Sequence, residues 1–179
     1  MKPLRSVLLL ALLVTLASSA AARPVTTWDK QIKGPTRFQV LKDFGGAAVL
    51  DKETGLVWET SPSADPFTWE FALYHCATLA VGGRAGWRLP GITELLSLVD
   101  PSVPPPGPAL PAGHPFTNVQ TNVPKFVYWT ASNSPFETGA TFAWEMNFVF
   151  GALSVTTTDK SATLLAWCVR GGNGVDPQS

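Results

Sequence analysis

Two cysteines are the residues of this chain best suited to covalent chemistry. Cys76 stands beside His75 in the segment TWEFALYHCATL, and Cys168 lies in LLAWCVR. A catalytic thiol needs a base and an electropositive setting, but neighbouring residues on a helix point about 100° apart. The spacing therefore favours a disulfide between Cys76 and Cys168, with a free reactive thiol as the alternative. In the chain-entropy model, closing so long a loop stabilises the fold by roughly 4 to 5 kcal/mol.

The sequence contains few candidate residues for metal binding or acid–base catalysis. His75 and His114 are the two histidines, and no second ligand stands at helical or hairpin spacing for zinc, so we expect both on the surface. Glu145 and Asn147 share one face of an expected strand, but two oxygens do not make a calcium cage. No Ser-His-Asp order, phosphate loop or HExxH segment is present. We therefore expect no catalytic residue, no metal and no cofactor.

The seven tryptophans could stack on sugar rings or fill a core. Trp58 and Trp167 occupy strand positions beside other apolar residues, so we expect them inside. We predict that Arg88 and Arg170 pair with Glu94 or other buried carboxylates and so hold the turn after residue 86 against the last strand. Residues with this role are called the structural group. This structural group comprises Trp87, Arg88, Glu94 and Arg170.

Two predicted helices, joined by an unusual Gly-Trp-Arg-Leu-Pro turn, must position these side chains. Apolar residues recur at helical spacing over residues 69–80 and place Cys76 on the buried stripe. A Gly-Gly pair stops this helix, and Pro90 fixes an extended entry into a second helix that ends at Asp100. The first stripe consists of Trp69, Ala72, Leu73, Cys76, Leu79 and Ala80, and the second of Ile92, Leu95, Leu96 and Val99.

The rest of the chain favours short strands separated by turns, which predicts an α+β domain with an antiparallel sheet. Residues 52–55 are predicted to form a hairpin turn between two strands, and Phe150-Gly151 marks another turn. The proline- and glycine-rich residues 103–115 exclude helix and sheet and favour an extended surface loop. The expected strands are 38–41, 47–51, 56–59, 128–132, 142–148, 152–157 and 164–170.

The first residues predict export from the cytoplasm. Lys2 and Arg5 precede an apolar run, and Ala20-Ala21-Ala22 supplies small residues for cleavage, so residues 1–22 are typical of a signal peptide. The run is short for a bilayer span, and a retained anchor is the alternative. Loss of the two basic residues takes the net charge from zero to near −2. We therefore expect a secreted or periplasmic protein, without a membrane span after cleavage, that does not bind nucleic acid.

The densest basic group of the chain has acidic neighbours. Such spacing is typical of an ordinary solvated segment and not of a patch that binds polyanions. The group consists of Lys30, Lys33, Arg37 and Lys42.

Several motifs, in their order, resemble a bacterial domain family typified by the C-terminal domain of the Legionella collagen-like adhesin. Over residues 49–172 the order is LDKETGLVWE, TWEFALYHCATL, GWRLPGITELLSLVD, YWTAS, AWEMNF with a glycine turn, and CVRGG. The most specific parts are the Trp-Arg-Leu-Pro turn with the helix after it and the closing Cys-Val-Arg-Gly-Gly. The chain departs from the family at Gly91, where a Thr usually caps the second helix, a change worth only about a few tenths of a kcal/mol.

The resemblance implies a C-type-lectin-like fold of the variety shared with formylglycine-generating enzymes. It consists of two helices packed on a small, twisted antiparallel sheet, with a disulfide from helix to last strand. The adhesin is associated with sulfated polysaccharides and trimers, but this chain has neither a Gly-X-Y tract nor a basic surplus. The predicted organisation is a signal peptide at 1–22, an N-terminal extension at 23–46, a lectin-like domain at 47–172 and a tail at 173–179.

The resemblance also locates a binding face, because the family's variable loops lie between the strands after residue 127. We expect a non-catalytic lectin-like domain that binds a polysaccharide or a cell-surface protein. The alternatives are a structural or assembly module of the cell envelope without sugar binding, and an enzyme. The predicted ligand-binding residues are Tyr128, Trp129, Asn133, Glu137, Trp144 and Asn147.

Overall fold

The computed structural model describes residues 32–121, 127–135, 141–149 and 155–172. Its helices are α1 (Gly34–Arg37), α2 (Trp69–Thr78) and α3 (Ile92–Leu96), with 3-10 turns η1 (Lys42–Phe44) and η2 (Val81–Gly83). Its strands are β1 (Phe38–Val40), β2 (Ala48–Asp51), β3 (Val57–Glu59), β4 (Trp87–Arg88), β5 (Tyr128–Asn133), β6 (Phe142–Met146), β7 (Val155–Asp159) and β8 (Val169–Arg170). The predicted signal peptide, the C-terminal tail and the turn at Phe150-Gly151 lie outside the described residues.

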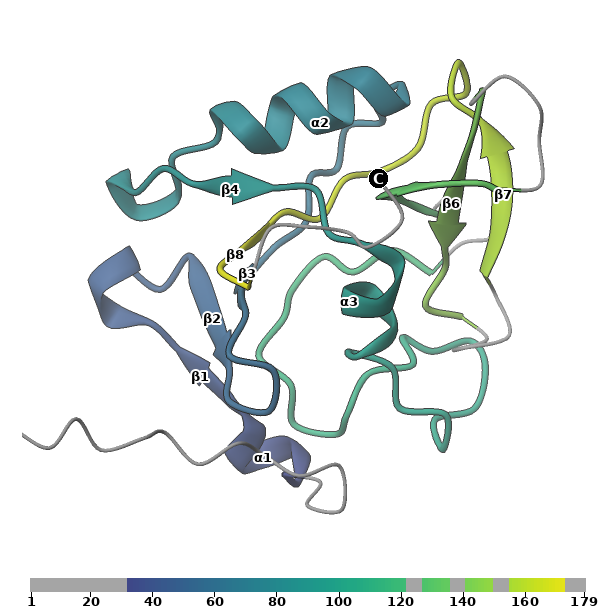
Figure 1. The fold of residues 1–179 in the computed structure, drawn as a ribbon. Helices are drawn as coiled ribbons and strands as arrows, with labels where there is room; N and C mark the ends of the chain where they lie inside the picture. Colours follow the sequence, from purple (N-terminus) through teal and green to yellow (C-terminus); the bar gives the residue numbers. More distant parts are fainter. Residues whose placement is uncertain (1–31, 122–126, 136–140, 150–154, 173–179) are drawn as a thin grey trace, which may run out of the picture.

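Two sheets organise the described part of the chain (Figure 1). The five-stranded sheet has the order β1-β2-β3-β8-β4, and the three-stranded sheet has the order β5-β6-β7. Every neighbouring pair is antiparallel, which confirms the α+β and antiparallel predictions. The expectation of one small sheet is wrong, because the last strand pairs with β3 and β4 and leaves β5, β6 and β7 to pair among themselves.

The five-stranded sheet begins before residue 47, the predicted start of the domain. Strand β1 pairs with β2 from Phe38 opposite Asp51 to Val40 opposite Val49, so the end of the predicted extension is part of the folded unit. Arg37, expected in a solvated segment, is 4% exposed. Its guanidinium donates two hydrogen bonds to the Asp51 carboxylate, at 2.8 and 2.6 Å, because a buried charge requires a paired partner.

Helices α2 and α3 form where the apolar stripes predict them, but each ends earlier than expected. Leu79 has extended backbone dihedral angles after α2, so Ala80 is exposed and not on the buried stripe. After α3, the Leu98 N–H donates to the Leu95 carbonyl in a tighter turn. The helix therefore ends at Leu96 and not at the predicted Asp100, whose N–H donates to the carbonyl of Ala109. In the described part of the chain, no helix is both long enough and apolar enough to cross a membrane.

The proline-rich segment 103–115 is only partly the surface loop that its composition predicts. Ala109, Leu110 and Pro111 are buried. The Ala109 N–H donates to the Phe148 carbonyl at 2.6 Å, and Leu110 joins the main hydrophobic core. Proline excludes helix and sheet but does not prevent the apolar residues beside it from entering a core.

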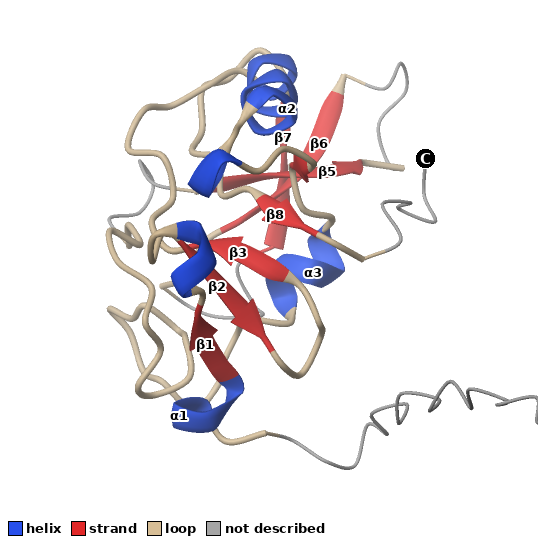
Figure 2. Ribbon diagram, turned by 90° about the vertical axis from the view of Figure 1, so that its left-hand side faces the viewer, coloured by secondary structure: helices blue, strands red, loops and turns tan. Residues whose placement is uncertain are grey.

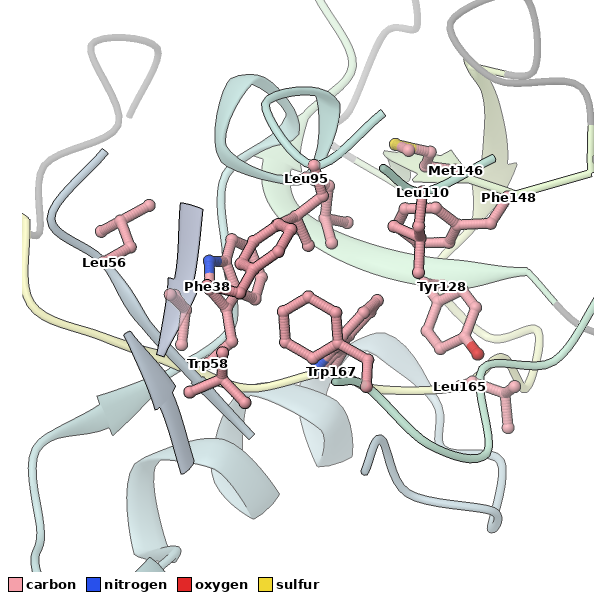
Figure 3. Packing of buried hydrophobic residues seen from close by; sticks show 14 residues of the cluster. Phe38, Leu56, Trp58, Leu95, Leu110, Tyr128, Met146, Phe148, Leu165 and Trp167 are labelled. Carbon is pink, nitrogen blue, oxygen red and sulfur yellow. The ribbon is translucent and has the colours of Figure 1, made fainter. Parts of the chain in front are cut away.

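Segment 164–170 is the centre of the molecule, although only its last two residues form strand β8. Its even-numbered residues from Leu164 to Cys168 pack into one hydrophobic cluster, and its odd-numbered residues from Leu165 to Val169 pack into the other. Figure 3 shows the Trp167 ring among aromatic and aliphatic side chains of the main cluster. The predicted continuous strand is interrupted because the segment pairs in turn with Phe67, Tyr128 and Trp58.

Candidate functional site

The turn that joins α2 to α3 is held by polar contacts to its backbone and to the last strand. Arg88 and Glu94 form the expected ion pair, with two N–O distances of 2.7 and 2.6 Å. Arg88 Nη2 also donates to the Gly171 carbonyl at 2.9 Å, beyond β8. Arg170 does not pair with a carboxylate among its described contacts, since its Nε donates to the Ala85 carbonyl. The side chains predicted as structural thus tie the turn to β8, and Trp87 beside them is buried.

The start of α3 replaces the missing threonine cap with two other groups. Glu94 Oε2 accepts the Gly91 N–H at 2.9 Å while it is paired with Arg88. The Ile92 N–H donates to Oγ of Ser132, on β5, at 3.0 Å. The first backbone donors of a helix need such partners, so Ser132 supplies across space what a threonine at position 91 supplies locally.

The disulfide between Cys76 and Cys168 is present and confirms the prediction. Both cysteines are fully buried, and the structure contains no free cysteine in its described residues. The alternative of a reactive thiol is therefore wrong. The bridge fixes the inner face of α2 to the residue directly before β8.

The predicted binding face on β5 is largely buried. Tyr128 and Trp129 are both 0% exposed, which corrects the expectation of exposed rings there. The Tyr128 hydroxyl accepts the Gln120 N–H at 2.7 Å, and burial raises the pKa of this hydroxyl. Trp129 Nε1 donates to the Phe67 carbonyl at 2.8 Å. Tyr128 and Trp129 point to opposite faces of β5 and pack into the two different hydrophobic clusters, so both faces of the strand are covered at its start.

The other predicted binding residues fall into three environments. Asn147 is buried, and its Oδ1 accepts the Val149 N–H at 3.1 Å. Trp144 is half-buried on β6. Asn133 is half-buried at the end of β5, and Glu137 lies outside the described residues. The structure thus does not gather the five described members of the predicted site on one open surface.

Asn133 belongs to a small polar cluster beside the start of α2. Lys160 Nζ donates to Asn133 Oδ1 at 2.6 Å and lies 3.9 Å from the centroid of the Trp69 ring. Trp69, expected in the core, is half-buried, and its Nε1 donates to the Thr130 carbonyl at 2.8 Å. These contacts attach α2 to the three-stranded sheet.

Two buried carboxylates are features that the sequence did not reveal. Glu59 is buried at the end of β3, and burial raises its pKa from 4.5 to about 7. Its Oε2 accepts the Cys168 N–H at 2.8 Å. Burial also raises the pKa of Glu145 on β6. Because Glu59 and Cys168 are 109 positions apart, no local pattern could indicate this contact.

The two histidines are half-buried and not on the open surface as expected. The His75 ring stacks on Phe67 with centroids 4.6 Å apart, and the His114 ring stacks on Phe116 at 5.9 Å. Burial lowers the pKa of both histidines, because it disfavours the charged imidazolium form. In the described ranges, no three histidine, cysteine or acidic side chains come together as a metal site.

The outward face of α2 is the most open apolar surface among the described residues. Phe71 is 66% exposed and Tyr74 is 67% exposed, whereas Ala72 and Cys76 on the same helix are fully buried. The remaining large exposed apolar side chain is Val40, on β1. This exposed pair was not predicted, although the helical spacing indicates it, because Phe71 and Tyr74 lie on the side of the helix opposite the apolar stripe.

Helix α2 lies at one end of the molecule, along β4, with α1 at the opposite end (Figures 1 and 2). It therefore presents Phe71 and Tyr74 away from the hydrophobic cluster that its inner face helps to close through Ala72 and Cys76.

A comparison with family models matches residues 47–170 to the family described as the Lcl C-terminal domain. The match confirms the resemblance inferred from the motifs. A comparison with curated proteins gave no match.

Proposed function

The chain belongs to the Lcl C-terminal domain family, and from this premise we propose that it is a secreted or periplasmic, non-catalytic lectin-like domain that binds a polysaccharide or a cell-surface protein. The family relates the chain to an adhesin domain. The C-type-lectin-like fold is part of the proposal, and the α+β architecture with its helix-to-strand disulfide is consistent with it.

The exposed aromatic pair on α2 is the observation that carries this proposal. An aromatic side chain has a large apolar face that loses little conformational entropy on binding, so aromatic residues are enriched at binding surfaces. Phe71 and Tyr74 contribute little to the core because both are two-thirds exposed. A role in ligand contact accounts for their position better than a role in folding.

The test uses the chain without residues 1–22, with the disulfide verified by mass spectrometry of the non-reduced protein. A glycan array and a pull-down from an envelope extract then report sugar and protein ligands. Binding to a polysaccharide or to a surface protein is the expected outcome. Absence of any ligand for the folded protein contradicts the proposal, and stable co-purification with one partner without sugar binding favours the assembly module instead.

A further inference from the structure

The α2 platform, defined as Glu70, Phe71 and Tyr74, is a continuous surface on one helix. Residues three and four apart on a helix are neighbours, so Phe71 and Tyr74 lie side by side and Glu70 flanks Tyr74. All three are exposed, as are Ala77 and Thr78 on the same face. Single exposed apolar residues are ordinary, but two adjacent aromatic side chains that are each two-thirds exposed form a patch.

The platform is presented on a fixed support. The inner face of α2 is held by the Cys76–Cys168 disulfide, and its first turn by hydrogen bonds from Trp69 to Thr130 and Lys160. A ligand that binds to α2 therefore does not need to order this helix first. Such preorganisation lowers the entropic cost of binding.

The size of the platform indicates the kind of partner. Phe and Tyr side chains bury roughly 150 to 250 Å² each, so two that are two-thirds exposed offer at most roughly 350 Å². A stable protein interface buries about 800 Å² on each partner. Two neighbouring rings are too small for that interface, but they match the C–H faces of one or two sugar rings.

The charge of the platform indicates an uncharged ligand. Helix α2 contains no lysine or arginine, and its exposed face carries the Glu70 carboxylate. Two basic groups that flank α2 lie over rings outside the platform: Lys160 lies over Trp69, at the start of the helix, and Arg84, after its end, lies over Phe44. A sulfated or carboxylated chain at this surface meets a like charge, whereas sugar hydroxyls can donate hydrogen bonds to Glu70.

We propose that the α2 platform binds a neutral polysaccharide, with Phe71 and Tyr74 stacked on pyranose rings and Glu70 accepting hydrogen bonds from hydroxyl groups. The inference rests on the proposed function and names its site and ligand class. Each ring is expected to contribute roughly 3- to 10-fold to affinity, which corresponds to about 0.7 to 1.4 kcal/mol and lies in the range of contacts between aromatic rings. Loss of both rings therefore lowers affinity roughly 10- to 100-fold.

The experiment prints neutral gluco-, manno-, galacto- and N-acetylglucosamine oligosaccharides beside their sulfated counterparts. Three proteins are applied: the wild type, F71A/Y74A and the control V40A, which removes an exposed apolar side chain from β1. Alanine favours helix, so the double variant keeps α2 folded, and circular dichroism verifies this. We expect the wild type and V40A to bind a neutral oligosaccharide at least as well as its sulfated counterpart, and F71A/Y74A to lose at least 10-fold.

Two outcomes overturn the inference and differ in what they say of the proposed function. If a glycan binds the wild type and F71A/Y74A equally, or only sulfated glycans bind, the platform or its ligand class is wrong while a binding function stands. If no glycan binds but a surface protein is retained by the wild type, the inference fails and the proposed function survives through its protein ligand. If neither binds, both fail.

Discussion

The two faces of α2 have opposite roles and opposite exposure. The inner face carries Ala72 and Cys76, both fully buried, and is joined covalently to the strand at the centre of the molecule. The outer face carries Phe71 and Tyr74, both two-thirds exposed. A rotation of about half a turn around one helix thus separates residues that hold the fold from residues that are open to a ligand.

This contrast shows that the segment by which the family is recognised also contains the surface proposed to bind. The sequence pattern around Cys76 and the joining turn is a structural pattern, and the expected binding residues all lie after residue 127. The outer face of α2 belongs to the same segment. The residues that identify the family and the residues proposed to bind a ligand thus lie on opposite faces of one helix and not in different parts of the chain.

Removal of the disulfide is expected to have the largest effect. The double variant C76A/C168A should lose about 4 kcal/mol of unfolding free energy, because the bridge closes a long loop in the unfolded chain. Guanidinium unfolding measures this loss as a lower midpoint, with a steeper slope because the unfolded chain without the bridge exposes more surface. Wild type under reducing conditions is the matched control and should show the same loss. A change below about 1 kcal/mol contradicts the view of the inner face as a covalent anchor.

The buried Glu59 carboxylate beside the bridge should make stability depend on pH. Its folded pKa is raised from 4.5 to about 7, so its stabilising contribution is complete below pH 4.5 and lost as pH rises through 7. The shift corresponds to about 3 kcal/mol. The variant E59Q keeps an acceptor for the Cys168 N–H without the charge, so its stability relative to wild type should increase from pH 5 to pH 8. Urea unfolding at each pH tests this, and parallel curves for the two proteins contradict it.

The ion pair of the joining turn should contribute less, because both partners are about one-quarter exposed. Arg88 and Glu94 have exposed fractions of 27% and 22%. We expect R88A to lose about 1 to 2 kcal/mol, after allowance for solvent screening, and R88K to recover only part because lysine cannot make the bidentate contact. Thermal and denaturant unfolding measure the loss. K52A, which removes an exposed lysine, is the control, and equal stability of R88A and K52A rules out the role assigned to the pair.

Changes on the outer face of α2 should have the smallest effect on stability. F71A/Y74A is expected to change the unfolding free energy by less than about 0.5 kcal/mol, since exposed substitutions away from caps and ion pairs are near neutral. Its binding to neutral oligosaccharides should nevertheless fall. A72L on the inner face is the matched comparison, because overpacking a fully buried alanine costs about 1 to 3 kcal/mol. Similar losses in both variants would remove the distinction between the two faces.

Local sequence patterns predicted the helices and strands better than they predicted which elements pack against one another. The 3.6-residue spacing of apolar residues located α2 and its buried cysteine, because burial of one helix face is a local property of the sequence. The family resemblance wrongly placed Tyr128 and Trp129 on an open binding face. Alternation along a strand indicates which residues share a face, but it does not reveal that β5 is covered on both faces.

Contacts between distant residues explain the other differences. Ser132 caps α3 from 40 positions away, and Glu59 meets Cys168 across 109 positions, so neither leaves a trace in neighbouring residues. The α2 platform is a different case. Its residues lie on the side of α2 opposite the apolar stripe, so the helical spacing that located the stripe also indicates their exposure.

The late position of segment 164–170 in the chain determines when the fold can form. It follows every other described strand in the chain, yet its alternate residues enter both hydrophobic clusters, and it lies between β3 and β4 in the larger sheet. A chain emerging from the ribosome, N-terminus first, lacks this segment until nearly all of the domain has been made. Both cores stay incomplete until then, so the domain should remain an open polypeptide throughout its synthesis and close in a single late event.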